Sequence, residues 1–191
     1  RVLMEMFGNR RIETLRIPFF CVSTNLSRGE LAVHRDGLLW RWVRASLSIP
    51  GLAPPLVEDG ELYVDGSVLN NLPVDVMRDQ APGPVIALSV GSERGPSIEA
   101  VQDHVPSKWS ALRARLAGGD GTPDVPSIVD ILIGATMVSG RRTSKAFEPM
   151  ADLVIHPDAG DFGLLEFSAM SKLVDIGYEY AVEVLKDWSL E

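Results

Sequence analysis

Residues 62–73 have the sequence Leu-Tyr-Val-Asp-Gly-Ser-Val-Leu-Asn-Asn-Leu-Pro, in which an apolar strand ends on an acid, Asp65. Glycine follows at once, so the backbone can turn sharply at Gly66 and another group can approach the carboxylate closely. Asn70 and Asn71 then supply side-chain amides, and the N-terminus of a following helix offers free N–H groups. These surroundings suit an ionised, oriented carboxylate that acts on a neighbouring hydroxyl. The structural alternative is an ordinary Asp-Gly turn, and the two asparagines could orient Asp65 or cap the helix.

Strands and helices alternate on both sides of this stretch. Residues 1–10 predict the end of a helix near Gly8. The runs 17–24 and 85–90 are continuously apolar, which predicts buried strands. The turn pair Asp59-Gly60 predicts a hairpin. We predict the other strands over 30–35, 55–58, 61–64 and 153–156. We predict helices over 38–47, 71–79 (opened by an Asn71 cap), 108–116, 127–139 and 168–188, with surface loops over 91–107 and 118–126. This order indicates one layered α/β domain spanning residues 1–191.

The composition is that of a globular protein, with 46% hydrophobic and 23% charged residues. The net charge of −8 argues against a nucleic-acid binder and against strong electrostatic docking on anionic lipid. The longest apolar stretch, 128–138, is interrupted by Asp130 and is shorter than the roughly 20 residues of a membrane span. The charged opening, residues 1–5, does not resemble a signal peptide, and the missing initiator Met suggests a processed product or a fragment.

Cysteine and histidine usage indicates neither a disulfide nor a metal site. The single cysteine, Cys21, lies in an apolar run, so we interpret it as a small buried hydrophobe rather than a nucleophile. A chain without disulfides favours a reducing compartment. The histidines His34, His104 and His156 lack ligand-like spacing. We therefore expect no metal and no cofactor.

Residues 64–75 resemble the catalytic-aspartate motif of patatin-like phospholipases, in which Asp-Gly-Gly or Asp-Gly-Ala supplies the acid of a Ser–Asp dyad. Ser67, at the third position of the motif, departs mildly from that pattern. The resemblance covers most of residues 7–188. The segments that are similar to the neuropathy-target-esterase branch of the family are 33–51, 85–91, 161–163 and 174–180.

This resemblance implies a three-layer α/β/α patatin-like domain that is only partly present. The family places its Gly-x-Ser-x-Gly nucleophile elbow and its Gly-rich oxyanion loop before the aspartate motif, and neither occurs in the 191 residues. The chain would thus be the C-terminal part of a catalytic domain, lacking the N-terminal strand, elbow and helix. The N-terminal remainder of the same domain would be its partner. We predict that the chain alone is inactive.

The implied activity is hydrolysis of a phospholipid or lysophospholipid ester. By this resemblance Asp65 would be the catalytic acid, and Gly66, Asn70 and Asn71 would support it. The resemblance and composition together imply a cytoplasmic protein with transient contact at a membrane surface, and no nucleic-acid partner.

Other candidate site residues have structural explanations beside the functional ones. Ser46 and Ser48 lie where the family has its active-site wall, but they also fit a helix end. Arg35, Arg41 and Arg44 could meet a lipid phosphate or form surface ion pairs. The helix 128–138 could line an acyl channel or touch a membrane, although core packing is its ordinary role.

Two other functional classes remain as alternatives. The missing nucleophile elbow favours a non-catalytic α/β module that binds lipid or a protein partner. A nucleotide-binding domain is disfavoured, because the sequence has no Gly-rich loop between the first strand and the first helix. Residues 91–95 also lack the glycine spacing and the Lys of a phosphate loop.

Overall fold

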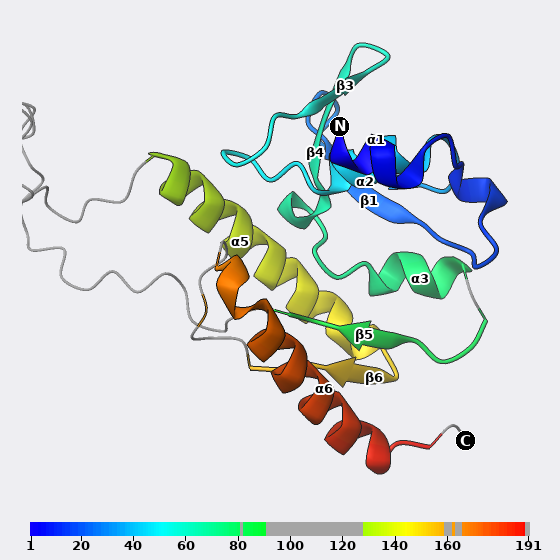
Figure 1. Cartoon of the computed structure of the whole chain (residues 1–191), viewed down its shortest axis with the longest axis vertical. Helices are drawn as coiled ribbons and strands as arrows, with labels where there is room; N and C mark the ends of the chain where they lie inside the picture. The colour runs from blue at the N-terminus through cyan, green and yellow to red at the C-terminus, as the bar shows by residue number, and fades with distance from the viewer. Residues whose placement is uncertain (81, 91–127, 159–161, 163–165, 190–191) are drawn as a thin grey trace, which may run out of the picture.

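The strands form two separate sheets in the computed structural model, which describes residues 1–80, 82–90, 128–158, 162 and 166–189 (Figure 1). An antiparallel sheet has the order β2-β1-β4-β3, and β5 pairs in parallel with β6. The strands are β1 (Cys21–Asn25), β2 (Glu30–His34), β3 (Leu56–Glu58), β4 (Glu61–Asp65), β5 (Ile86–Leu88) and β6 (Leu153–Ile155).

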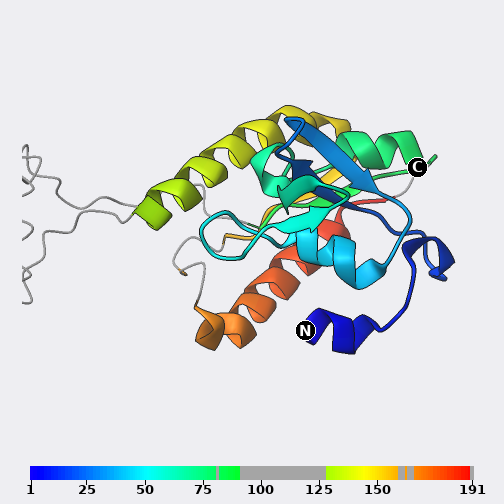
Figure 2. The same cartoon turned by 90° about the horizontal axis from the view of Figure 1, so that it is seen from above.

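The helices flank these sheets. They are α1 (Val2–Phe7), α2 (Leu39–Ser46), α3 (Val74–Gln80), α5 (Ile128–Phe147) and α6 (Met170–Lys186), with 3-10 turns η1 (Ile12–Thr14), η2 (Gly66–Val68), η3 (Glu148–Met150) and η4 (Phe167–Ala169). Figure 2 shows α5 and α6 on opposite sides of β5 and β6, so this part is layered helix, sheet, helix. The predicted α/β class is confirmed.

A small apolar core joins the parallel strands to the helices around them. The buried residues come from the α3 region and from β5. Residues from the end of α5 and from the β6 region pack against them. The members are Leu72, Val74, Val85 and Ala87, with Phe147, Ala151 and Val154 packed against them. The core fixes α5 against the segment that follows Asp65.

The hairpin predicted from Asp59-Gly60 is confirmed. Both residues have positive φ, 50° and 80°, as the central pair of a mirror-image turn requires. Glu58 and Glu61 are opposed across the turn. This turn sets the register of β4 and hence the strand position at which Asp65 lies.

The strand predicted over residues 17–24 is wrong in its first half, since β1 begins only at Cys21. Ile17 is 79% exposed, and Phe19 is exposed as well. Pro18 offers no N–H to a neighbouring strand. Cys21, in contrast, is the first residue opposed to β2, through His34. Apolar character alone therefore did not define the strand.

The strand predicted over 85–90 is shorter than expected and is not buried throughout. Val85 and Ala87 are buried, whereas Ile86 and Leu88 are exposed. Such alternation is typical of a strand with one covered face. One face of β5 thus remains open among the described residues.

The helix predicted over 127–139 continues to Phe147 as α5, and its apolar stripe is not core. Ile131, Leu132 and Val138 are exposed. The buried positions are Gly140 and Ser144 instead, so the helix packs through small residues. The predicted loops 91–107 and 118–126 and the predicted helix 108–116 lie outside the described residues.

Candidate active site

Asp65 is the last residue of β4, and two backbone groups fix it. Its N–H donates to the carbonyl oxygen of Ser48 at 3.0 Å. Its carboxylate Oδ1 accepts from the N–H of Ser67 at 2.7 Å. Among the described residues, none hydrogen-bonds to Oδ2. The carboxylate is half-buried, so one oxygen is held and the other can meet a substrate or a partner hydroxyl.

Gly66 is required by close packing of the turn against β1. A Cβ at this position would lie 2.7 Å from both the Cγ2 and the carbonyl oxygen of Val22. The group that approaches the turn is therefore the backbone of β1. Gly66 also accepts from the N–H groups of Leu69 and Asn70, which closes η2 directly after the acid.

No hydrogen bond joins Asn70 or Asn71 to Asp65 in the described part of the chain. The buried Asn70 accepts from the N–H of Leu72 at 3.2 Å and donates through Nδ2 to Asp75 at 2.8 Å. Asn71 is exposed. Because α3 begins at Val74, the predicted Asn71 cap is wrong. The amide of Asn70 instead holds the turn that precedes the helix.

Ser48 links the end of α2 to Asp65. Its side chain is buried, and its Oγ donates to the carbonyl oxygen of Arg44 at 2.8 Å. This is the helix-end role expected of it, and its carbonyl oxygen then receives the Asp65 N–H. Ser46, half-buried in the last turn of α2, has no side-chain hydrogen bond among the described residues.

Each of the three arginines considered for a lipid phosphate lies close to a polar group of the protein itself. Arg41 forms an ion pair with Glu58. Arg44 donates to the carbonyl oxygens of Pro54 and Pro55 at 3.4 Å each. Arg35 lies 3.1 Å from the side-chain amide of Gln80.

A second polar cluster, Ser23, His34, Trp42 and Tyr63, lies on the same sheet face as Asp65. Ser23 is directly opposite Asp65 in the β1–β4 pairing, and its Oγ is 2.7 Å from His34 Nε2. The His34 ring stacks on Trp42 with centroids 3.9 Å apart, and Tyr63 meets both rings edge-on. Sequence reasoning missed this cluster, because it depends on the register between β1, β2 and β4.

Burial lowers the pKa of His34 to about 4, despite an opposing effect of Asp36. The imidazole is therefore neutral at physiological pH. Ser23 is fully buried, at 0% exposure. Because a hydroxyl without access to solvent cannot reach a lipid ester, we interpret this cluster as packing beneath β4 rather than as a catalytic group.

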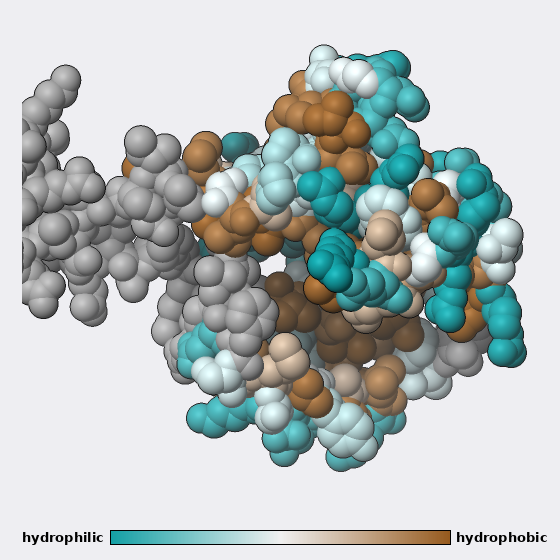
Figure 3. Space-filling model, turned by 45° about the horizontal axis from the view of Figure 1, so that its top comes forward, coloured by the Kyte–Doolittle hydropathy of each residue, from teal (hydrophilic) through white to brown (hydrophobic). Residues whose placement is uncertain are grey.

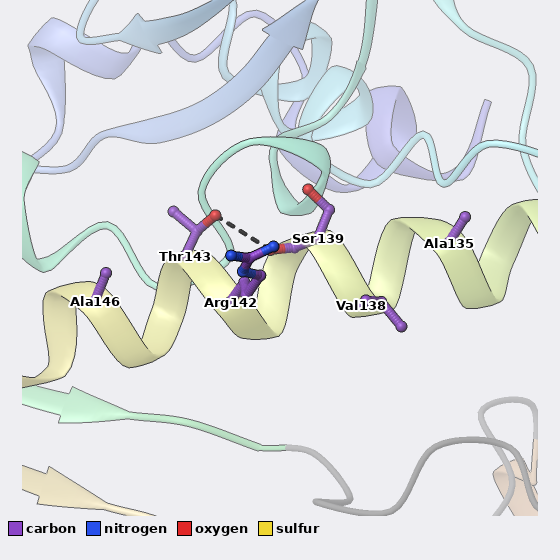
Figure 4. Close-up of a pocket in the computed structure, with 6 residues that line it drawn as sticks. All are labelled: Ala135, Val138, Ser139, Arg142, Thr143 and Ala146. Atoms are coloured by element: carbon purple, nitrogen blue, oxygen red, sulfur yellow. Dashed lines mark hydrogen bonds between the residues drawn. The ribbon is translucent and has the colours of Figure 1, made fainter.

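Helix α5 lies against the loop that follows Asp65. Ser139 Oγ donates to the carbonyl oxygen of Val68 at 2.9 Å. Along the same helix runs an open groove of about 580 Å³, whose lining is shown in Figure 4: Ala135, Val138, Ser139, Arg142, Thr143 and Ala146. Its mixture of apolar groups, hydroxyls and one cation is compatible with an amphipathic ligand.

The described part of the chain offers little other site chemistry. It contains no group of three His, Cys, Asp or Glu residues placed to hold a metal ion. Burial raises the pKa of the Cys21 thiol to about 12, which keeps it protonated and agrees with its interpretation as a small hydrophobe.

Apolar surface gathers in a hollow of the face shown in Figure 3. Exposed apolar residues of the parallel strands and α6 include Ile86, Leu88, Val174, Tyr178 and Val182. Within the described residues, no helix is both long enough and apolar enough to cross a bilayer. Exposed apolar surface of this kind usually marks a region that another molecule covers.

Comparison with known proteins identifies the family. The family model described as patatin-like phospholipase matches residues 1–78, which include the segment containing Asp65. The chain belongs to the patatin-like phospholipase family. Over 192 aligned residues it is 36% identical to "Lysophospholipase NTE1" of Mycosarcoma maydis, covering 100% of this chain and 10% of that protein.

Two further relatives in this family support the same branch. "Patatin-like phospholipase domain-containing protein 6" of Homo sapiens is 33% identical, over 99% of this chain and 14% of that protein. "Lysophospholipase NTE1" of Pyricularia oryzae is 30% identical, over 97% of this chain and 12% of that protein. The chain thus spans only about a tenth to a seventh of the length of these relatives. The resemblance predicted from the sequence, including its branch, is confirmed.

Proposed function

We propose that this chain supplies the acid of a Ser–Asp dyad that hydrolyses ester bonds of phospholipids or lysophospholipids. The observation that carries the proposal is the fixation of Asp65, whose backbone N–H is held by Ser48 and whose Oδ1 is held by Ser67. The names of the relatives support a lysophospholipid as substrate. The serine would come from polypeptide outside these residues, because they contain no Gly-x-Ser-x-Gly.

The proposed reaction begins when the serine hydroxyl attacks the ester carbonyl carbon and its proton passes to Asp65 Oδ2. The tetrahedral intermediate collapses as the ester C–O bond breaks, and Asp65 returns the proton to the leaving alkoxide. Water then attacks the acyl-serine with Asp65 as base, which releases the fatty acid and restores the serine hydroxyl.

The energetics require help from groups beyond Asp65. A carboxylate is a weak base for an alcohol, since an unperturbed Asp titrates near pH ~3.9. Oxyanion donors would have to stabilise the developing charge, at about 2.7–4 kcal/mol for each donor. Such donors would also lie outside this chain, so we expect the 191 residues alone to hydrolyse nothing. A piece that remains bound to the serine-bearing part of its domain would be active.

The exposed apolar face around β5 and α6 is the surface on which we place the serine-bearing remainder of the domain. Ile86 and Leu88 point away from the core on the open face of β5. A reducing, cytoplasmic setting with transient contact at a membrane surface is compatible with the single cysteine and the net charge of −8.

Asp65→Asn tests the proposal in a polypeptide that joins this chain to a Gly-x-Ser-x-Gly segment. The amide oxygen of Asn can still accept from Ser67, but the side chain cannot take a proton, so kcat with lysophosphatidylcholine should fall at least about a thousandfold. Asp59→Asn is the matched control, because the same change in the exposed hairpin turn keeps a residue that tolerates positive φ. Wild-type turnover in Asp65→Asn would refute the assignment.

A non-catalytic, lipid-binding role is the second candidate, and the groove along α5 favours it. A fluorophosphonate probe separates the two roles. The proposed function requires one covalent adduct on the joined polypeptide and none on the 191-residue chain. Binding of lysophospholipid without any adduct on either polypeptide would support the second role.

A further inference from the structure

The loop after Asp65 is enclosed between β1 and α5. On one side Gly66 lies against Val22 so closely that a Cβ would be 2.7 Å from its carbonyl oxygen. On the other side Gly140 of α5 lies against the same loop, where a Cβ would be 2.7 Å from the carbonyl oxygen of Ser67 and 3.2 Å from Asn71 Cβ. Neither β1 nor α5 therefore leaves space into which the loop could move.

Ser67, which lies in the loop between β1 and α5, is the residue that holds the Asp65 carboxylate. Ser67 donates its N–H to Asp65 Oδ1, and its carbonyl oxygen is the atom that a Cβ added at Gly140 would meet first. One residue further on, Val68 accepts from Ser139 Oγ at 2.9 Å. Figure 4 shows the Ser139 side chain pointing from α5 toward this loop. Two neighbouring residues of α5 thus set the position of two neighbouring backbone units after Asp65.

We propose that Gly140 and Ser139 are positioning residues for the Asp65 carboxylate. Gly140 allows α5 to approach Ser67, and Ser139 fixes Val68, so that the Ser67 N–H is aimed at Oδ1 and Oδ2 remains free for the serine hydroxyl. This inference rests on the proposed function of Asp65. It assigns to α5, which begins 63 residues after Asp65 in the chain, a direct influence on catalysis.

If Gly140 were an ordinary helix residue with no effect on the loop, Gly140→Ala would be expected to stabilise α5. Glycine inside a helix is less favourable than alanine, so Gly→Ala usually stabilises a helix where space allows. Gly177 in the interior of α6 provides the matched control, because a Cβ there meets nothing within 4 Å. In the 191-residue chain, Gly177→Ala should leave the loop after Asp65 unchanged.

Amide hydrogen exchange tests the geometry in the 191-residue chain itself. In Gly140→Ala, exchange at the Ser67 N–H should accelerate at least about tenfold, because the loop must move away from α5. Exchange at the Asp65 N–H, which Ser48 holds from the opposite side, should stay within about twofold. Unchanged protection at Ser67 in a folded Gly140→Ala chain would overturn the inference.

Kinetics test the consequence in the polypeptide that also carries the serine. Gly140→Ala should lower kcat by about tenfold to a hundredfold while KM stays within about twofold, because small misplacements of a catalytic group affect the chemical step. Ser139→Ala should lower kcat in the same direction, and Ser139→Thr, which keeps the hydroxyl, should restore it. A loss confined to KM would contradict a positioning role.

Two outcomes separate this inference from the proposed function. If Asp65→Asn is active, the proposed function fails, whatever the α5 variants do. If Asp65→Asn is inactive while Gly140→Ala and Ser139→Ala keep wild-type kcat, only the inference fails. Should Gly140→Ala not fold, Ser139→Ala decides the matter, and unchanged Ser67 exchange together with unchanged kcat in that variant would overturn it.

Discussion

The buried His34 should make the stability of this chain depend on pH well above the range in which its carboxylates titrate. In the fold, burial lowers the pKa of His34 to about 4, whereas the unfolded side chain titrates near 6.5. Between these values the unfolded state binds more protons than the folded state. The free energy of unfolding must therefore fall as the pH falls through this window.

The magnitude follows from the two pKa values. Acidification from about pH 7 to pH 5 should remove about 2 kcal/mol of stability, because the unfolded His34 gains a proton over this range at about 1.4 kcal/mol for each pH unit, while the folded His34 stays neutral. The carboxylates Glu13, Glu61 and Asp152 have lowered pKa values and ordinary values of 4.5 or 3.8. Most of their stabilising contribution is lost below about pH 4.5, so the loss between pH 7 and pH 5 comes mainly from His34.

Urea unfolding followed by tryptophan fluorescence measures this effect, since Trp42 stacks on the His34 ring. His34→Gln should be less stable at pH 7, because the stacking is lost, but its stability should change by less than about 0.5 kcal/mol between the two pH values. His156→Gln, which removes a histidine outside the cluster, should retain the wild-type slope. An equal acid-induced loss in His34→Gln and in the wild type would refute the reasoning.

Two further predictions concern the packing beneath Asp65, and both are checked by the urea midpoint at constant m. Gly66→Ala should destabilise the chain by about 1–3 kcal/mol, because the added Cβ would overlap the backbone of Val22. A urea midpoint within error of the wild type would mean that the turn has room to move. Thr24→Val should stabilise the chain by about 1 kcal/mol. The buried Thr24 hydroxyl has no hydrogen-bond partner among the described residues, and valine has nearly the same shape as threonine. A loss of stability in this variant would show that the hydroxyl does have a partner.

Features set by neighbouring residues could be predicted from the sequence. The Asp59-Gly60 turn requires positive φ at two successive residues, and Asp and Gly tolerate this backbone best. The helix over 38–47 was also found, as α2, and the end of β4 at Asp65 follows from the glycine after it. Each of these depends on interactions within a few residues.

Features set by distant contacts could not be predicted in the same way. The Ser23–His34 cluster depends on strand register, which no local pattern specified. Gly140 stands in the interior of α5 because a larger residue there would meet Ser67, which belongs to a different element. The apolar run at residues 17–20 misled the prediction because its side chains are exposed rather than packed in the sheet.

The contacts that orient Asp65 come from β1, the end of α2 and α5, and the hydrogen bond between Ser139 and Val68 joins residues 71 positions apart. Contacts that close such long chain segments form late in folding, because the entropy of loop closure must be overcome first. A short peptide with the residue 62–73 sequence would contain the acid without its orientation. During synthesis, the Asp65 carboxylate would therefore become fully oriented only after α5 has docked against the loop that follows it.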